Sequence, residues 1–141
     1  MGYNVIKQEG FNMDIEKNKK EMLDKKVWAV LGATPNKEKF GYKIYKKLKD
    51  NNYEVYPINP KYDDIEGEKC YNSFSDLPKN PDVVDFVVPP KVTYNSLDSA
   101  KEAGIEYLWF QPGTADENVI DKAENEEFKI VFHDCVLVAL G

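Results

Sequence analysis

The stretch Val27-Trp28-Ala29-Val30-Leu31-Gly32 decides the fold, because it places five consecutive apolar residues directly before a glycine. An unbroken apolar run of this length is typical of a strand buried on both faces, whereas a half-exposed strand alternates apolar and polar residues. Strands buried on both faces occur mainly in parallel sheets that carry helices on either side. The run therefore predicts an α/β protein, with its first important turn directly after Leu31.

Outward from this run, short apolar strands alternate with helical patterns. We expect further strands at residues 53–58, 83–88, 107–110 and 129–132, and helices at 14–26, 40–51, 92–103 and 114–125. Residues 136–140 are compatible with a short helix, a strand or a packed tail. The alternation predicts a three-layer Rossmann-like domain with a parallel five-stranded sheet, strand order 3-2-1-4-5, and helices on both faces. In that order the ligand crevice lies at the carboxyl ends of the first and fourth strands.

Length and composition limit the chain to one folded unit. With 141 residues and 42% hydrophobic content it has the material for a single packed core, at about 150 residues per domain. We expect residues 1–13 to form a flexible extension and residues 14–141 to form the domain. No run approaches the roughly 18 apolar residues of a membrane span, so we expect a cytoplasmic protein that does not bind membranes.

The charge pattern narrows the possible ligands. The net charge of −6 disfavours general binding to nucleic acid, which depends on basic residues that neutralise phosphates. All 19 basic residues are lysines, so an anion site must use backbone N–H groups, hydroxyls and Lys rather than a guanidinium. With two cysteines and one histidine, the chain lacks the paired ligands of a structural zinc site, and we expect no metal.

The turn after the first strand has the physical elements of a phosphate site. Gly32 permits a tight turn, Ala33 onward offers N–H groups, Thr34 adds a hydroxyl, and Gly41 stands near the expected start of a helix. A helix N-terminus carries partial positive charge, which favours phosphate. The spacing of these residues is not that of the G-x-G-x-x-G motif. The glycines are explained equally well if one only ends the strand and the other only packs closely against the sheet.

The turn after the second strand reads Asn59-Pro60-Lys61. Dinucleotide-binding domains usually place an acidic residue there to accept hydrogen bonds from a free ribose diol. The lysine instead suits a ribose that carries a phosphate, as in CoA with its 3′-phosphate or NADP with its 2′-phosphate. An exposed loop lysine without a ligand role is the alternative.

Several motifs follow one another in a recognisable order: Gly32-Ala33-Thr34, Phe40-Gly41-Tyr42, the run from Tyr53 to Pro60, Val84-Asp85-Phe86-Val87 and Trp109-Phe110-Gln111-Pro112-Gly113. In this order the chain resembles the small stand-alone CoA-binding proteins, whose domain is similar to the N-terminal CoA-binding domain of the succinyl-CoA synthetase α subunit. The resemblance covers about residues 20 to 135. It implies that the protein binds CoA or an acyl-CoA.

The resemblance also implies where the ligand binds. The first loop would take the pyrophosphate, the second turn the adenosine and its 3′-phosphate, and the loop after the third strand would border the pantetheine arm. Many relatives carry Arg in that last loop, where this chain has Pro89-Pro90-Lys91. The implied binding residues are Gly32, Ala33, Thr34, Pro35, Lys39, Gly41, Tyr42, Asn59, Pro60, Lys61, Val88, Pro89, Pro90, Gln111 and Gly113.

Three functions remain open at this point. The leading one is a CoA-binding or acyl-CoA-binding module without catalytic apparatus. The second is an enzyme, either an NADP-dependent reductase or a thiol enzyme in which His133 activates Cys135; a buried structural cysteine is the simpler interpretation. The third is a CoA-sensing regulator that acts on a partner protein. The sequence does not identify an acyl group, a protein partner or an oligomeric state, although a homodimer is compatible with a domain of this size.

Overall fold

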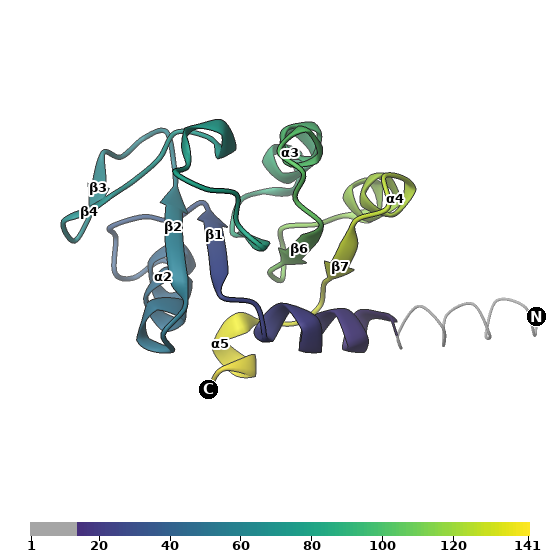
Figure 1. Ribbon diagram of the computed structural model, residues 1–141, viewed down its shortest axis with the longest axis horizontal. Coiled ribbons are helices and arrows are strands. Elements are labelled where there is room, and N and C mark those ends of the chain that lie inside the picture. The colour runs from purple at the N-terminus through teal and green to yellow at the C-terminus, as the bar shows by residue number, and fades with distance from the viewer. Residues whose placement is uncertain (1–13) are drawn as a thin grey trace, which may run out of the picture.

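The computed structural model describes residues 14–141 and is built around one five-stranded parallel sheet. Its strands are β1 (Val27–Leu31), β2 (Glu54–Ile58), β5 (Val83–Phe86), β6 (Tyr107–Phe110) and β7 (Lys129–Val131). Helices cover both faces of the sheet (Figure 1). The predicted three-layer Rossmann-like α/β class is therefore confirmed. The predicted extension over residues 1–13 lies outside the described residues.

The order of the strands is β2-β1-β5-β6-β7, which is 2-1-3-4-5 when the five sheet strands are counted along the chain. The expected order of 3-2-1-4-5 therefore misplaces the third strand, which lies beside the first instead of outside the second. The direction of chain crossover reverses between β1 and β5, so the crevice is at their carboxyl ends rather than between the first and fourth strands.

Pro57 gives the physical reason for this order. A proline has no N–H for the sheet, so it belongs on an edge strand rather than a central one. Here β2 is an edge strand, and the carbonyl oxygen of Pro57 accepts a hydrogen bond from the N–H of Tyr71 at 2.9 Å. All four residues of β5 are buried, as expected for a strand with a neighbour on each side.

Two layers of helices enclose the sheet. On one face lie helical residues 14–23, α2 (Phe40–Asp50) and α5 (Val136–Ala139), packed around Trp28, Trp109 and Val30. On the other lie α3 (Pro90–Glu102) and α4 (Glu117–Asn125), packed around Phe86, Phe110 and Leu108. Figure 1 shows α3 and α4 together on one side, with α2 and α5 on the opposite side. No helix within residues 14–141 is long and apolar enough to cross a membrane.

Some helix boundaries differ from the expected ones. The third helix begins at Pro90 rather than residue 92, because the fixed φ of proline suits the first helical position. The fourth begins at Glu117 rather than residue 114, and its N-cap is Asp116, whose carboxylate accepts from the N–H of Val119 at 2.9 Å. The Thr114 hydroxyl instead donates to the carbonyl of Gln111.

The connection from β2 to β5 contains no long helix. It forms a hairpin of β3 (Asp64–Ile65) and β4 (Glu68–Lys69), followed by one 3-10 turn, η1 (Phe74–Asp76). This hairpin, which the sequence does not predict, turns through Glu66 and Gly67, both with positive φ. Since only η1 covers this part of the sheet face, space remains between η1 and α3.

Candidate functional site

The turns after β1 and β5 lie in direct contact at the carboxyl edge of the sheet. Gly32 has a φ of +103°, and a Cβ on it would lie 2.4 Å from the carbonyl oxygen of Val87. A Cβ on Gly41 would lie 2.1 Å from the carbonyl oxygen of Gly32. Side chains at these two positions would force the backbones apart. Glycine at both positions therefore lets the end of β1, the start of α2 and the chain after β5 lie in contact. A site that binds an anion through backbone N–H groups requires such a close approach.

The start of α2 opens onto a hollow of about 410 Å³. Its N-cap, Lys39, makes no side-chain capping bond, so no side-chain oxygen occupies the N–H groups of the first turn. Glu38 also lines this hollow, and its carboxylate opposes an anion there. The complete lining is Gly32, Thr34, Glu38, Lys39, Phe40, Gly41 and Val87.

The turn after β2 is tied to the turn after β1. The side-chain amide of Asn59 donates to the carbonyl of Ala33 at 2.9 Å, and its oxygen accepts from the N–H of Lys61 at 3.0 Å. Ala33 and Thr34 are buried, whereas Pro60 and Lys61 are exposed. The structure thus brings the two predicted turns together and leaves the Lys61 ammonium in solvent beside them.

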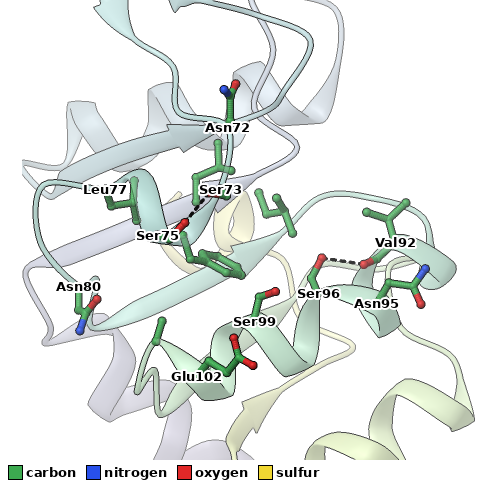
Figure 2. A pocket seen from close by; sticks show the side chains of 14 residues that line it. Asn72, Ser73, Ser75, Leu77, Asn80, Val92, Asn95, Ser96, Ser99 and Glu102 are labelled. Carbon is green, nitrogen blue, oxygen red and sulfur yellow. Dashed lines mark hydrogen bonds between the residues drawn. The ribbon is translucent and has the colours of Figure 1, made fainter.

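A second hollow, of about 730 Å³, lies between η1 and α3. Leu31 and Ile58, at the ends of β1 and β2, form part of its floor together with Phe74. Figure 2 shows neutral amides and hydroxyls around it, with Glu102 at one end. Its polar lining residues are Asn72, Ser73, Ser75, Asn80, Asn95, Ser96, Ser99 and Glu102.

None of the residues that line this hollow was among the predicted binding residues. Two hydrogen bonds order its walls: Ser73 and Ser75 are joined at 3.0 Å, and the Ser96 hydroxyl donates to the carbonyl of Val92 at 2.8 Å (Figure 2). The hollow exists because no long helix connects β2 to β5, and only the three-dimensional structure shows this. A weak signal was present, since residues 59–82 contain no helical pattern longer than one turn.

The loop after β5 leads into a third hollow, of about 470 Å³. Pro90 and Tyr94 of α3 line it together with Asp116, the N-cap of α4. Val88 and Pro89 connect Val87, whose carbonyl oxygen lies against Gly32, to Pro90 at the edge of this hollow.

Two predicted binding residues have partners inside the protein. The amide of Gln111 donates to both carboxylate oxygens of Asp85, at 2.8 and 2.9 Å, so this side chain points into the core. The Tyr42 hydroxyl donates to the Glu66 carboxylate, which raises the pKa of Tyr42 and lowers that of Glu66. Gly113 is exposed, with a φ of +85°. Neither Gln111 nor Tyr42 offers a free side-chain donor to the crevice.

The structure does not pair His133 with Cys135, as the thiol-enzyme hypothesis requires. No hydrogen bond joins His133 to Cys135, and the His133 ring instead stacks edge-on against Phe132 at 4.5 Å. Cys70 and Cys135 are both free. Burial raises the pKa of the Cys70 thiol, which further reduces its reactivity. Within residues 14–141 there is also no group of three or more metal-ligating side chains.

Comparison with known proteins agrees with this geometry. The family model for the CoA-binding domain matches residues 26–141, nearly the whole described chain. The chain belongs to the CoA-binding domain family. It shares this domain with ADP-forming acetate–CoA ligases.

Relatives of this CoA-binding domain fall into two groups by size. An ADP-forming acetate–CoA ligase of Methanocaldococcus jannaschii is 44% identical over 78 residues, which are 55% of this chain and 11% of the ligase. Another, from Archaeoglobus fulgidus, is 32% identical over 126 residues, or 79% of this chain and 18% of that ligase. The chain thus spans less than a fifth of the length of these two curated ligases.

Solved structures include proteins of similar size. A conserved hypothetical protein of Pyrococcus furiosus is 44% identical with a TM-score of 0.77, covering 81% of this chain and 98% of that one. A hypothetical protein of Pyrococcus horikoshii is 34% identical with a TM-score of 0.81, covering 87% of each chain. This fold therefore also occurs in chains of similar length to this one.

Proposed function

We propose that this protein binds CoA or an acyl-CoA in the crevice at the carboxyl ends of β1, β2 and β5. The observation that carries the proposal is the convergence of the Gly32 turn with the Asn59-Pro60-Lys61 turn, joined by the bond from Asn59 to Ala33. This arrangement offers close backbone approach on one side and an exposed lysine on the other. Membership in the CoA-binding domain family supports the choice of ligand.

Each part of CoA has a matching environment. The pyrophosphate fits the hollow at the start of α2, where N–H groups and Lys39 meet it, with Glu38 as an opposing charge. The 3′-phosphate fits near Lys61, since a ribose phosphate needs a cation and no carboxylate follows Ile58 directly. The pantetheine arm would cross Val88, Pro89 and Pro90, and the hollow beside Tyr94 lies next along that path.

The adenine base fits the hollow between η1 and α3. Adenine is flat and neutral, so it requires an apolar surface and hydrogen-bonding groups without charge. Leu31, Ile58 and Phe74 supply the surface, while asparagine and serine side chains supply donors and acceptors. No lysine lines this hollow, which disfavours it as the phosphate site.

A blocking substitution tests this placement. Ser99 is an exposed residue of α3 that lines the hollow, so Ser99→Trp should fill it without disturbing the core. Glu124→Trp, at an exposed position of α4, is the matched control. We expect CoA to raise the melting temperature of wild type and E124W, since about 2.7 kcal/mol is gained at 100 times Kd, and to raise that of S99W much less. Equal shifts in all three proteins would reject this adenine site.

The same thermal assay tests the class of ligand. CoA, acetyl-CoA, NADP and NAD are compared with wild type at one concentration. The proposal expects stabilisation by CoA or acetyl-CoA. Stabilisation by NADP alone would favour a reductase instead, and the absence of any shift would contradict a nucleotide-binding function.

A further inference from the structure

Asp85 is a fully buried acid in the middle of the sheet. It lies on β5, opposite Val30 of β1 and Trp109 of β6. No salt bridge in the described chain includes it, and its carboxylate accepts hydrogen bonds only from Gln111. Burial raises the pKa of Asp85 well above its ordinary value, and the Gln111 bonds only partly oppose this. An apolar side chain would avoid that cost, so the acid calls for a specific role.

Gln111 connects Asp85 to two other segments. Its side-chain oxygen accepts from the N–H of Val136, the first residue of α5, at 3.3 Å. Its backbone oxygen accepts from the N–H and the hydroxyl of Thr114, at 3.0 and 2.7 Å, which closes the loop after β6. A single residue thus holds both the loop at the carboxyl edge of β6 and the start of the last helix.

The orientation of the Gln111 amide depends on Asp85. At least one carboxyl oxygen of Asp85 accepts a hydrogen bond whether or not the acid is protonated, so the amide NH₂ faces β5. The amide oxygen is then left to face Val136. A side chain without an acceptor at position 85 would remove this preference and leave a buried NH₂ unpaired, which is costly.

The segment before α5 is held by further contacts at its other end. The backbone oxygen of Asp134 accepts from the indole N–H of Trp109 at 2.9 Å, and its carboxylate pairs with Lys19 at 2.7 Å. The titratable groups on this segment are His133, Asp134 and the half-buried Cys135, with Lys19 paired to Asp134. The hydrogen bonds from Gln111 to Asp85 and from the Val136 N–H to Gln111 connect the start of α5 to β5.

We propose that Asp85 is a positioning residue, which fixes the Gln111 amide and through it the loop after β6 and the start of α5, so that the carboxyl edge keeps the shape that the ligand requires. The ligand part of this inference rests on the proposed function. The structural part stands on the Asp85, Gln111 and Val136 contacts alone.

The test compares Asp85→Leu, which removes the acceptor, with Asp85→Asn, which keeps one. Thr93→Val serves as a matched control, because Thr93 is also buried and bonds only within its own helix end. Two measurements report how firmly the start of α5 is held. They are the hydrogen exchange of the Val136 amide relative to that of Val84 in β5, and the rate of Cys135 alkylation mapped by mass spectrometry. The Val84 reference separates local loosening from global unfolding. CoA affinity is measured alongside.

We expect D85L to raise relative Val136 exchange and Cys135 alkylation about tenfold and to weaken CoA binding about fivefold, while D85N and T93V stay within about twofold of wild type. If D85L does not fold, Gln111→Met is measured in its place, because this variant removes the acceptor of the Val136 N–H and keeps Asp85. Unchanged Val136 exchange in the folded variant, or equal loosening in D85N and D85L, would overturn the proposal. If wild type binds no CoA, the proposed function fails, and Val136 exchange still decides the positioning role.

Discussion

The side-chain amide of Asn59 donates to the carbonyl oxygen of Ala33 at 2.9 Å, which joins the turn after β2 to the turn after β1. The Asn59 oxygen at the same time accepts from the N–H of Lys61 at 3.0 Å. One side chain thus sets the distance between the proposed pyrophosphate site and the proposed 3′-phosphate site. The two turns lie 26 residues apart in the sequence.

Asn59→Ala should therefore reduce both stability and ligand affinity. It removes two hydrogen bonds, each of which contributes about 1 kcal/mol, so we expect the free energy of unfolding to fall by about 1 to 3 kcal/mol. Urea unfolding measures this loss, and calorimetric titration with CoA measures the affinity. Asn59→Asp is the informative comparison, since it keeps the acceptor for Lys61 and places a carboxylate against the Ala33 carbonyl. Wild-type CoA affinity in both variants would show that this bond does not shape the site.

Gly41→Ala tests the close approach of α2 to the Gly32 turn. Alanine is normally favoured over glycine inside a helix by about 1 kcal/mol. Here its Cβ would lie 2.1 Å from the Gly32 carbonyl oxygen, so the backbone has to move. We expect a net loss of about 1 to 3 kcal/mol in urea unfolding, as for other overpacked sites. Lys43→Ala, at an exposed position of the same helix, should change stability by less than about 0.5 kcal/mol. A G41A protein as stable as wild type would contradict the packing described.

Asp85 predicts a specific dependence of stability on pH. Its folded pKa is raised by burial, so the folded state retains a proton that the unfolded state releases above about pH 3.9. The stability that this group contributes is present below that pH and is lost as the pH rises through its folded pKa. In Asp85→Asn this loss is absent. We expect the stability of wild type relative to D85N to fall as the pH rises from about 4 to 8.

Urea unfolding at several pH values measures that difference. Acids whose pKa is lowered, such as Glu21, Glu54 and Glu66, contribute the opposite trend, but they are present in both proteins and cancel in the comparison. A difference that is constant over this range would show that Asp85 titrates alike in the folded and unfolded states.

The sequence predicted the sheet strands well because each one is a short apolar run, and the first four are followed within three residues by Gly, Pro or Asn. The strand order was wrong because apolar content does not say which strands are neighbours. Pro57 was the available signal, since a residue without an N–H in the second strand argues for an edge position. The β3–β4 hairpin was missed because strands of two residues carry no periodicity, although Glu66-Gly67 has the form of a two-residue turn.

The site was predictable where the backbone carries it and unpredictable where side chains from distant segments meet. Gly32 and Gly41 follow from the turn after the first strand, and the structure shows the close contacts that require them. The hollow between η1 and α3 forms where two segments about 20 residues apart come together and no helix fills the space between them. A local sequence pattern does not predict such a site. Gln111 was expected at the ligand, and its burial against Asp85 depends on the neighbouring strand.

A comparison of CoA with dephospho-CoA tests most directly whether this protein recognises CoA through its 3′-phosphate. Calorimetric titration with both ligands is carried out on wild type, on Lys61→Ala and on Lys20→Ala, an exposed lysine of the first helix that serves as control. We expect wild type and K20A to bind CoA at least about tenfold more tightly than dephospho-CoA, a difference of about 1.4 kcal/mol. K61A should lose most of that preference. Equal affinity of wild type for the two ligands, or the same preference in K61A, would contradict recognition of the 3′-phosphate by Lys61.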